Sequence, residues 1–283
     1  MNFNQLRQIG SASFQFHPNL LQVDLANNKL QHIQDRTFAA QTVLQTLVLS
    51  HNRLSSINNS TFHGLSSLER LDLAFNAFTV LTDFSLESLQ NLRELKLNDN
   101  KISVISVNAF SGLNFLESLN LANNELTQVD SRPLSLVQSL RTLSLSQNRI
   151  PELPPNSFSF LVWLSSLDLS DNPVQTEKLS GDCLRGLTRL SSLDLSGLNI
   201  TSLPPDLLLP TSALTDLVLD RTNIVEIKSV PLRYLQHLSL SGNSRLVRID
   251  EDSLRHSLNL RSLNLSHNPL LSTLPASLLA SLG

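Results

Sequence analysis

The sequence predicts a protein of the α/β class, folded as a solenoid in which a parallel β-sheet lines the concave face of a horseshoe. Irregular, 3₁₀ or short helical segments should form the convex side. Three observations lead to this prediction. Leucine makes up nearly a quarter of the 283 residues, whereas aromatic residues supply only 5%. Seven Asn residues recur at intervals of 24. The segment before each Asn alternates apolar and polar residues, which is the period of a half-buried strand.

Each repeat follows one pattern, of which Leu44-x-x-Leu47-x-Leu49-x-x-Asn52-x-Leu54 is an example. The Asn residues of the regular series are Asn28, Asn52, Asn76, Asn100, Asn124, Asn148 and Asn172. Beyond them the spacing varies, and the last four repeats begin at Leu190, Leu214, Leu235 and Leu260. We therefore expect a single repeat domain over 1–283, with a partial repeat at 1–19 and about eleven repeats from 20 to 283.

The apolar positions and the Asn of each repeat have separate roles. Neighbouring strands must be parallel, because the chain returns along the outer side in the same sense each time. The Asn amide is expected to bond backbone groups that no strand satisfies, so stacked Asn side chains should form a ladder. A further apolar position in each repeat should pack in a column along the outer side. Its members are Phe14, Phe38, Phe62, Leu86, Phe110, Leu134, Phe158, Leu184, Leu208, Leu232, Leu254 and Leu279.

The pattern is broken in the repeats that follow Asn172. Two extra residues enter one repeat, Leu198 then stands where the ladder Asn belongs, and Thr222 replaces Asn in the next repeat. A Leu side chain neither donates nor accepts a hydrogen bond, so the ladder should be interrupted there. Such a break is typical either of a functional bend or of sequence drift that a neighbouring group, such as Asn199, compensates. We favour the second interpretation.

These repeats resemble the leucine-rich-repeat family, specifically its 24-residue typical class, which occurs in the ectodomains of Toll-like receptors and in chaoptin- and Slit-like adhesion proteins. The resemblance covers essentially the whole chain. Ectodomains of this family close both ends with cysteine-rich caps, and neither cap is visible here. Met1 falls on the last Leu position of an incomplete strand, while Leu279 and Leu282 finish an outer half. The resemblance implies an internal fragment of a longer protein, with uncapped dimerisation through the ends as the alternative.

Composition and motifs argue against several classes of function. A net charge of −3 lacks the positive footprint that binding to nucleic acid or anionic lipid needs, and no apolar run is long enough to span a membrane. Cys183 is the single cysteine, so we expect no internal disulfide and no structural zinc site, only a small buried residue. The His residues lack metal-binding spacing, and no nucleophile elbow or phosphate loop is present. We expect no enzymatic activity, metal or cofactor.

The remaining candidate is a binding surface on the concave strand face. Charged and bulky residues concentrate there in the third to fifth repeats, around Phe75, the one aromatic residue near this face. Aromatic and Arg side chains are frequent anchors of protein interfaces. We predict a protein-binding patch formed by Arg70, Asp72, Phe75, Glu94, Lys96, Asn98 and Asn120. The alternative is a solvated sheet face without a partner.

Four Asn residues lie in Asn-x-Ser/Thr sequences and are candidate glycosylation sites: Asn58, Asn59, Asn199 and Asn264. With the family resemblance they favour an extracellular or cell-surface location. The expected function is recognition of a protein ligand or co-receptor by a membrane-anchored or secreted glycoprotein in cell adhesion or signalling. This segment itself is expected neither to insert into a membrane nor to bind nucleic acid. A cytoplasmic scaffold or regulatory subunit with the same fold is the alternative.

Overall fold

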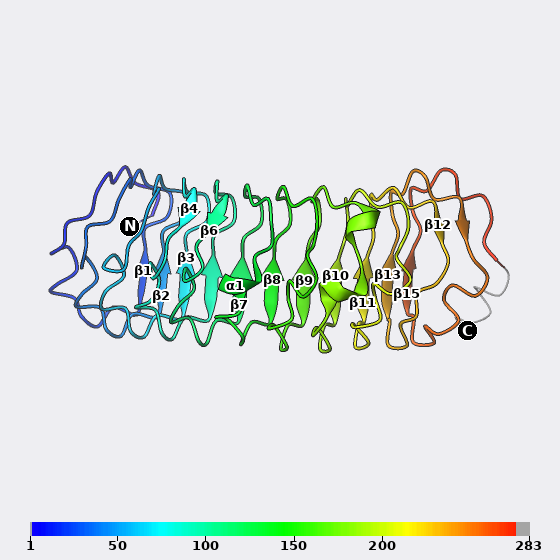
Figure 1. Ribbon diagram of the computed structural model, residues 1–283. Helices are drawn as coiled ribbons and strands as arrows, with labels where there is room; N and C mark the ends of the chain where they lie inside the picture. Colours follow the sequence, from blue (N-terminus) through cyan, green and yellow to red (C-terminus); the bar gives the residue numbers. More distant parts are fainter. Residues whose placement is uncertain (1, 276–283) are drawn as a thin grey trace. The chain divides into compact units, whose positions relative to one another are not determined.

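The computed structural model describes residues 2–275 (Figure 1). Met1, Leu279 and Leu282, which the repeat pattern assigns to the two ends of the chain, lie outside the described residues. The chain forms two compact units. The first unit comprises Met1–Leu126 and Arg132–Ser144, and the second comprises Thr127–Ser131 and Leu145–Gly283. In each unit, one turn of the solenoid corresponds to one sequence repeat.

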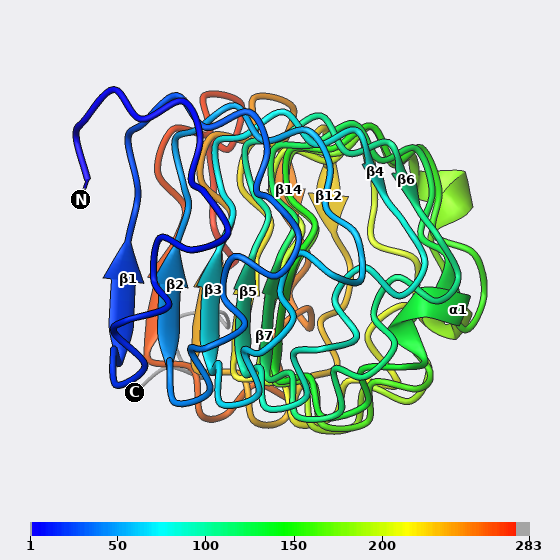
Figure 2. The same ribbon diagram turned by 90° about the vertical axis from the view of Figure 1, so that its left-hand side faces the viewer.

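The first unit has one short strand in each full turn. The strands are β1 (Gln22–Asp24), β2 (Thr46–Val48), β3 (Arg70–Asp72), β5 (Glu94–Lys96), β7 (Ser118–Asn120) and β8 (Thr142–Ser144). They pair in this order, and all are parallel. Figure 2 shows β1, β2, β3, β5 and β7 side by side with their arrows in one direction. The register joins equivalent positions of successive repeats, as in the pair Leu47 and Leu71.

Two smaller elements lie outside this row of strands. The strands β4 (Val80–Leu81) and β6 (Val104–Ile105) pair with each other, also in parallel. The chain also forms a four-residue helix, α1 (Ser131–Leu134). Figure 2 shows α1 on the side of the molecule opposite β1. The connecting segments are otherwise turns and irregular structure, as predicted for the outer side.

The second unit repeats this arrangement with less regular spacing. Its main strands are β9 (Ser166–Asp168), β10 (Ser192–Asp194), β11 (Asp216–Val218), β13 (His237–Ser239) and β15 (Ser262–Asn264), again paired in parallel and in this order. A separate pair joins β12 (Glu226–Ile227) to β14 (Arg248–Ile249). The two extra residues fall where the 3₁₀ segments η1 (Thr176–Lys178) and η2 (Gly181–Leu184) form. The predicted parallel solenoid with a mostly irregular outer side is therefore confirmed.

The core consists of leucines from the strands and a column of larger side chains from the outer segments. Leu47 and Leu95 are fully buried, as are most of their equivalents, whereas Leu263 in β15 is half-buried. Phe38 and Phe62 of the predicted column are also inaccessible to solvent, and the rings of Phe14 and Phe38 stack with their centroids 5.5 Å apart. The other described members are buried to 5% exposure or less: Leu86, Phe110, Leu134, Phe158, Leu184, Leu208, Leu232 and Leu254. The predicted column is therefore confirmed over the described residues.

The Asn residues form the predicted ladder, and Asn100 shows its geometry. The Asn100 Nδ2 atom donates to the backbone oxygen of Leu97 in its own turn and to that of Leu73 in the preceding turn, both at 3.1 Å. The Oδ1 atom accepts the backbone N–H of Phe78 at 3.2 Å. Leu73 O also accepts Asn76 Nδ2 at 3.1 Å. This carbonyl is thus shared by two Asn side chains, one from its own turn and one from the next, and so is Leu97 O.

The residue just before each ladder position has a left-handed backbone. In the first unit these residues are Asn27, His51, Phe75, Asp99 and Asn123, and in the second they are Gln147, Asp171, Gly197, Arg221, Gly242 and His267. This conformation turns the chain inward, so that the next side chain can reach the backbone oxygens of the strand. It also directs the backbone N–H of the same residue toward the following turn. His51 N–H, for example, donates to Ala74 O at 3.0 Å. Gly and Asn adopt this conformation with little strain, whereas bulky residues do not.

One suggestion from the sequence is wrong. Asn199 was considered as a replacement for the missing ladder Asn, but its side chain is exposed, and its Oδ1 accepts Asn223 Nδ2 at 2.8 Å on the surface. Leu198 occupies the ladder position as an apolar side chain with 1% exposure. In the next turn, Thr222 serves the ladder in part, because its Oγ1 donates to Asn243 Oδ1 at 2.6 Å. Leu198 keeps the inward-facing ladder position. Asn199 is the next residue along the chain, and its side chain therefore points outward.

Candidate functional site

The predicted patch lies on three adjacent strands of the first unit. Arg70 and Asp72 stand at the two ends of β3, and Glu94 and Lys96 at the two ends of β5. The strand register places Arg70 beside Glu94 and Asp72 beside Lys96. The central leucines of these strands point into the core, so their flanking residues must point outward. Asn120 follows on β7, beside Lys96.

The charged side chains of the patch make few contacts of their own. Arg70 Nε donates to Thr46 Oγ1 at 3.2 Å, and Lys96 Nζ lies 3.2 Å from Glu94 Oε1. The Lys96 side chain is 46% exposed and that of Glu94 35% exposed. Ion pairs this accessible contribute little to stability. These groups are therefore available to exchange their present contacts for contacts with a partner.

The backbone and side chains of β2, β3 and β5 surround a small hollow. Its volume is about 100 Å³, and its lining includes Thr46, Arg70, Asp72, Glu94 and Lys96. Pockets for drug-sized ligands typically enclose about 300–1,000 Å³. This hollow therefore suits a single side chain of a larger partner, and the face as a whole is a surface rather than a ligand pocket.

Two members of the predicted patch have a structural task. Asp72 Oδ1 accepts the backbone N–H of Ala74, and Asn120 Oδ1 accepts that of Ala122, both at 3.0 Å. These bonds cap the turn that follows each strand, as Asp and Asn commonly do. Equivalent caps are made by Asp24, Asp168, Asp194 and Asn264. Lys96, at the same strand position, has no side-chain oxygen and makes no such cap.

Phe75 is joined by an aromatic residue that the sequence reasoning overlooked. The rings of His51 and Phe75 stack with centroids 4.1 Å apart and an interplanar angle of 10°. Both residues have positive φ, 55° and 53° respectively. Phe75 nevertheless remains 43% exposed. The spacing of 24 residues between them was the signal that could have revealed this pair, because it places them at equivalent points of adjacent turns.

Asn98 lies next to this stack and has an unused acceptor. Its Nδ2 donates to Asp99 Oδ2 at 2.7 Å, and Asp99 Oδ1 accepts Asn123 Nδ2 at 2.5 Å. Within residues 2–275, the Asn98 Oδ1 atom is buried without a hydrogen-bond partner. An unmatched buried acceptor is costly.

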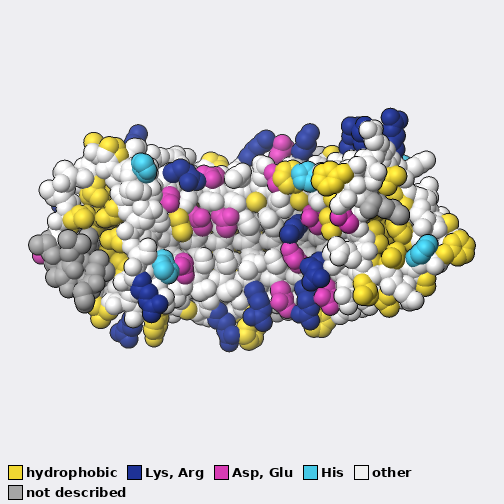
Figure 3. Space-filling model, turned by 180° about the vertical axis from the view of Figure 1, so that it is seen from behind, with side chains coloured by type: hydrophobic (Ala, Val, Ile, Leu, Met, Phe, Trp, Pro, Cys, Tyr) yellow, Lys and Arg dark blue, Asp and Glu magenta, His cyan; other side chains and the backbone are white. Residues whose placement is uncertain are grey.

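The strand face of the second unit has several aspartate side chains on neighbouring turns. Asp168 and Asp194 lie side by side on β9 and β10, and Asp216 and Asp220 belong to the next turn. Burial raises the pKa of Asp194 above its ordinary value, and the charges of Asp168 and Asp220 add to this effect, while hydrogen bonds from Ser196 oppose it. Figure 3, which views the molecule from behind, shows acidic and basic side chains interspersed among neutral groups.

The candidate glycosylation sites are all exposed, but they differ in their contacts. Asn58 Nδ2 donates to Asp35 Oδ1 at 2.9 Å, while its Oδ1 accepts the backbone N–H groups of Ser60 and Thr61. Among residues 2–275, the Asn59 side chain makes one hydrogen bond, in which its Oδ1 accepts Ser60 Oγ at 3.3 Å. Asn199 bonds Asn223, and Asn264 Nδ2 donates to Ser239 Oγ. Asn59 therefore has the least engaged amide nitrogen of the first pair.

Other candidate chemistry is limited. Cys183 is buried, as predicted, and its Sγ donates to Leu153 O at 2.9 Å. Within residues 2–275, no group of three or more His, Cys, Asp or Glu side chains is arranged to hold a metal ion. Over the same range, no helix has both the length and the apolar character that crossing a bilayer requires.

Comparison with known proteins agrees with this geometry. One leucine-rich-repeat family model matches residues 18–78, 67–126 and 115–174, and a second matches 259–282. A search of curated protein sequences found no significant match. The crystal structure of a TLR13–ssRNA13 complex is similar, with a TM-score of 0.84 and 30% identity over 93% of this chain, which spans 39% of that chain.

Two further structures share the fold at lower identity. The leucine-rich-repeat domain of APL1B has a TM-score of 0.65 and 24% identity, with 95% of this chain and 80% of that chain covered. The functional domain of InlJ from Listeria monocytogenes has a TM-score of 0.65 and 22% identity, with 96% and 56% covered. Because the first family model alone matches more than half of the sequence, the chain belongs to the leucine-rich-repeat family.

Proposed function

We propose that the chain recognises a protein partner, without catalysis, through the strand face of its first unit, and that it does so within a cell-surface or secreted receptor or adhesion protein. The observation that carries this proposal is the exposed stack of His51 and Phe75, held beside the charged groups of β3 and β5. A partner would place an apolar group on Phe75 and pair its charges with Arg70 and Lys96.

The backbone of Phe75 supports a role in recognition. A bulky residue with positive φ costs about 1–3 kcal/mol, and Phe75 does not recover this by burial, because 43% of it is exposed. Asn27 and Asn123 occupy the equivalent position two turns away on either side, where they adopt the same conformation with less strain. An aromatic ring at this site is thus a disadvantage for folding, and contact with a partner is what it can provide.

The mixed charge of the patch favours protein over nucleic acid. The TLR13 structure is a complex with a single-stranded RNA. On this chain, acidic and basic residues alternate across the register, as in the neighbours Arg70 and Glu94, and the net charge is −3. Phosphate backbones bind to surfaces with a net excess of Lys and Arg. A protein surface, with charges of both signs, complements this pattern better.

The proposal is tested with a variant that removes the ring without harming the fold. Phe75→Asn places a residue that tolerates the left-handed conformation, so its thermal midpoint should equal or exceed that of the wild type. The chain, this variant and a triple variant with Arg70→Ala and Lys96→Ala added are applied to an array of purified extracellular domains. His267→Asn, at the equivalent position of the second unit, is the matched control.

We expect the wild type and His267→Asn to bind the same domain or domains, and both patch variants to lose that binding. Equal binding by all four proteins, or binding of single-stranded RNA in place of any protein, would contradict the proposal. The extracellular location is tested separately by secreted expression and enzymatic deglycosylation. We expect a mass shift that Asn59→Gln reduces, and no shift would favour the cytoplasmic alternative.

A further inference from the structure

A second surface lies on one edge of the second unit, where the chain enters its strands. We call it the entry rim and define it by Trp163, Arg189, Arg233, Tyr234, Leu258 and Arg261. These residues lie within two positions of the first Leu of their repeats. Backbone hydrogen bonds between successive turns hold these positions in register. Ser192 N–H donates to Ser165 O at 2.9 Å, and Ser262 N–H donates to Gln236 O at 3.0 Å.

The apolar members of the entry rim are well exposed. Trp163 is 45% exposed, Tyr234 54% and Leu258 73%. Single exposed apolar residues are common on protein surfaces, whereas a group of them on one edge marks an interaction site. Trp and Tyr are also the residue types that most often dominate interface energies. The composition of this edge therefore differs from that of an ordinary solvated turn.

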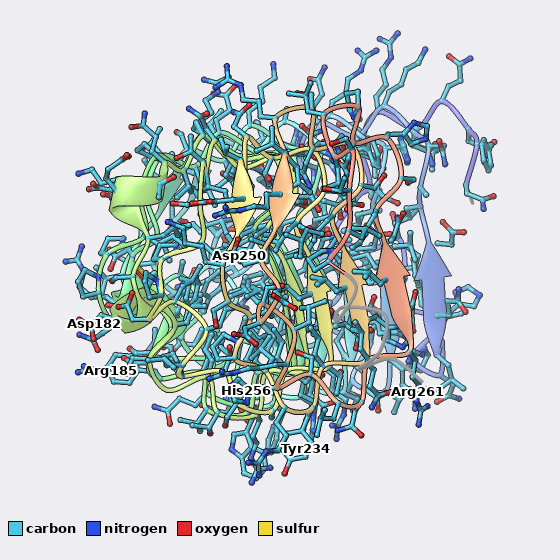
Figure 4. All side chains as sticks on the ribbon, turned by 90° about the vertical axis from the view of Figure 1, so that its right-hand side faces the viewer. Asp182, Arg185, Tyr234, Asp250, His256 and Arg261 are labelled. Atoms are coloured by element: carbon cyan, nitrogen blue, oxygen red, sulfur yellow. The ribbon has the colours of Figure 1, made fainter. Side chains whose placement is uncertain are left out.

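The entry rim also has positive charge that its surroundings do not neutralise. The Arg189 guanidinium lies 3.8 Å from the centroid of the Trp163 ring. Among residues 2–275, no carboxylate lies within ion-pair distance of Arg189, Arg233 or Arg261, and the remaining residues include no Asp or Glu. Figure 4 shows Tyr234 and Arg261 along the lower edge of the view.

Two other Arg residues of the second unit, in contrast to those of the entry rim, lie close to carboxylates. Arg185 lies 2.6 Å from Asp182, and Arg255 lies 4.0 Å from Asp252. Figure 4 shows Asp182 and Arg185 close together, away from Tyr234. Arg189, Arg233 and Arg261 thus differ from these two residues, and they give the entry rim a local positive charge in a chain whose net charge is −3.

A small residue stands between Arg189 and Tyr234 along the entry rim. Ala213, which is half-buried, occupies the equivalent position of the turn between them. Neighbouring parallel strands lie about 4.8 Å apart, so the two flanking side chains begin roughly 10 Å from each other. The Ala213 side chain is the shortest of the three.

We propose that the entry rim binds an acidic segment of a protein partner that carries an aromatic residue. Carboxylates of the segment pair with Arg233 and Arg261, and its aromatic side chain packs over Ala213 beside the exposed Tyr234 ring. Guanidinium groups bind carboxylates through paired, charge-assisted hydrogen bonds. The site lies entirely in the second unit, and it is independent of the patch around Phe75.

The test uses the random copolymer of Glu and Tyr as the acidic, aromatic probe. Trp163 is the only tryptophan of the chain, so its fluorescence, excited selectively, reports binding at the entry rim. We expect saturable quenching that weakens as salt is added, and weaker binding of poly-Glu, which lacks the aromatic residue. Arg233→Glu with Arg261→Glu should weaken binding of the copolymer at least about tenfold. Ala213→Trp should weaken it by covering the surface beside Tyr234 with a large side chain.

A charge-matched control separates local from general electrostatics. Lys101→Glu with Arg245→Glu makes the same change in net charge at exposed residues outside the entry rim. Circular dichroism checks that every variant is folded. Equal weakening by both charge-reversal pairs, or equal affinity for the copolymer and poly-Glu, would overturn the proposal. Tighter binding of single-stranded oligouridylate than of the copolymer would also overturn it, as would self-association through this edge detected by sedimentation.

Discussion

Replacing Asn100 with Leu should measure what one step of the Asn ladder contributes to stability. The chain itself has Leu at the ladder position of another turn, since Leu198 is buried there with 1% exposure. A Leu side chain therefore fits this environment. The cost of Asn100→Leu will then report lost hydrogen bonds rather than a steric clash.

The magnitude follows from the partners of Asn100. Its loss leaves the Phe78 amide without its acceptor, which costs about 1–3 kcal/mol. Leu73 O keeps the Asn76 donor and Leu97 O keeps the Asn124 donor, so each loses only a second bond. Those two losses cost about 0.5–1 kcal/mol each. We expect a total decrease in the free energy of unfolding of about 2–5 kcal/mol.

Urea unfolding followed by circular dichroism measures the total loss of unfolding free energy. Hydrogen exchange of the Phe78 amide shows whether the loss is local to the missing hydrogen bond. Exchange at Phe78 should accelerate more than at amides several turns away. Asn114→Leu, at an exposed position, is the control and should change stability by less than about 0.5 kcal/mol. A cost for Asn100→Leu no larger than that of the control, with Phe78 still protected, would refute the reasoning.

Three further changes test other parts of the structure. Leu121→Ala, at a fully buried position, should lower the free energy of unfolding by about 2–5 kcal/mol, and a loss below about 1 kcal/mol in urea titrations would show a less packed core. Because the folded state raises the pKa of Asp194, the charged carboxylate is disfavoured at neutral pH, so Asp194→Asn should raise the thermal midpoint there. This advantage should shrink as the pH falls through the raised pKa, and a pH-independent difference would contradict it. Gly197→Ala should lower the free energy of unfolding by about 1–3 kcal/mol, because φ is +68° at Gly197 and the new Cβ collides with Asp171 Oδ1. In the control Gly10→Ala, the new Cβ meets only Ser13 Oγ at 3.7 Å, so stability should not change.

Much of the fold could be predicted because each repeat presents the same physical problem. The alternation around Leu47 requires a strand with one buried face, and the polar residue at Asn52 must serve the backbone where the strand ends. Equivalent positions such as Phe38 and Phe62 then stack once the period is known. The ladder, the parallel register and the outer column all follow from this repetition.

The candidate site was harder to predict, because one residue type can serve two purposes. Asp72 and Asn120 were expected to bind a partner, yet their oxygens cap the next turn. The sequence does not distinguish these roles, since both place a polar side chain at the end of a strand. The 24-residue spacing places His51 beside Phe75, but that their rings stack depends on backbone dihedrals that the sequence does not show. The prediction for Asn199 is wrong because a shift of one position reverses the direction of a side chain.

In the regular repeats, the sharing of a strand-end carbonyl by two Asn side chains has a consequence for how such chains change length. A turn contributes one donor to its predecessor and receives one from its successor. Duplicating or deleting a whole turn therefore restores every donor and acceptor at the new junction. Removing part of a turn leaves an unmatched group inside the protein. Genetic variation in the number of turns should accordingly be tolerated in complete units, whereas fractional insertions survive only on the outer loops.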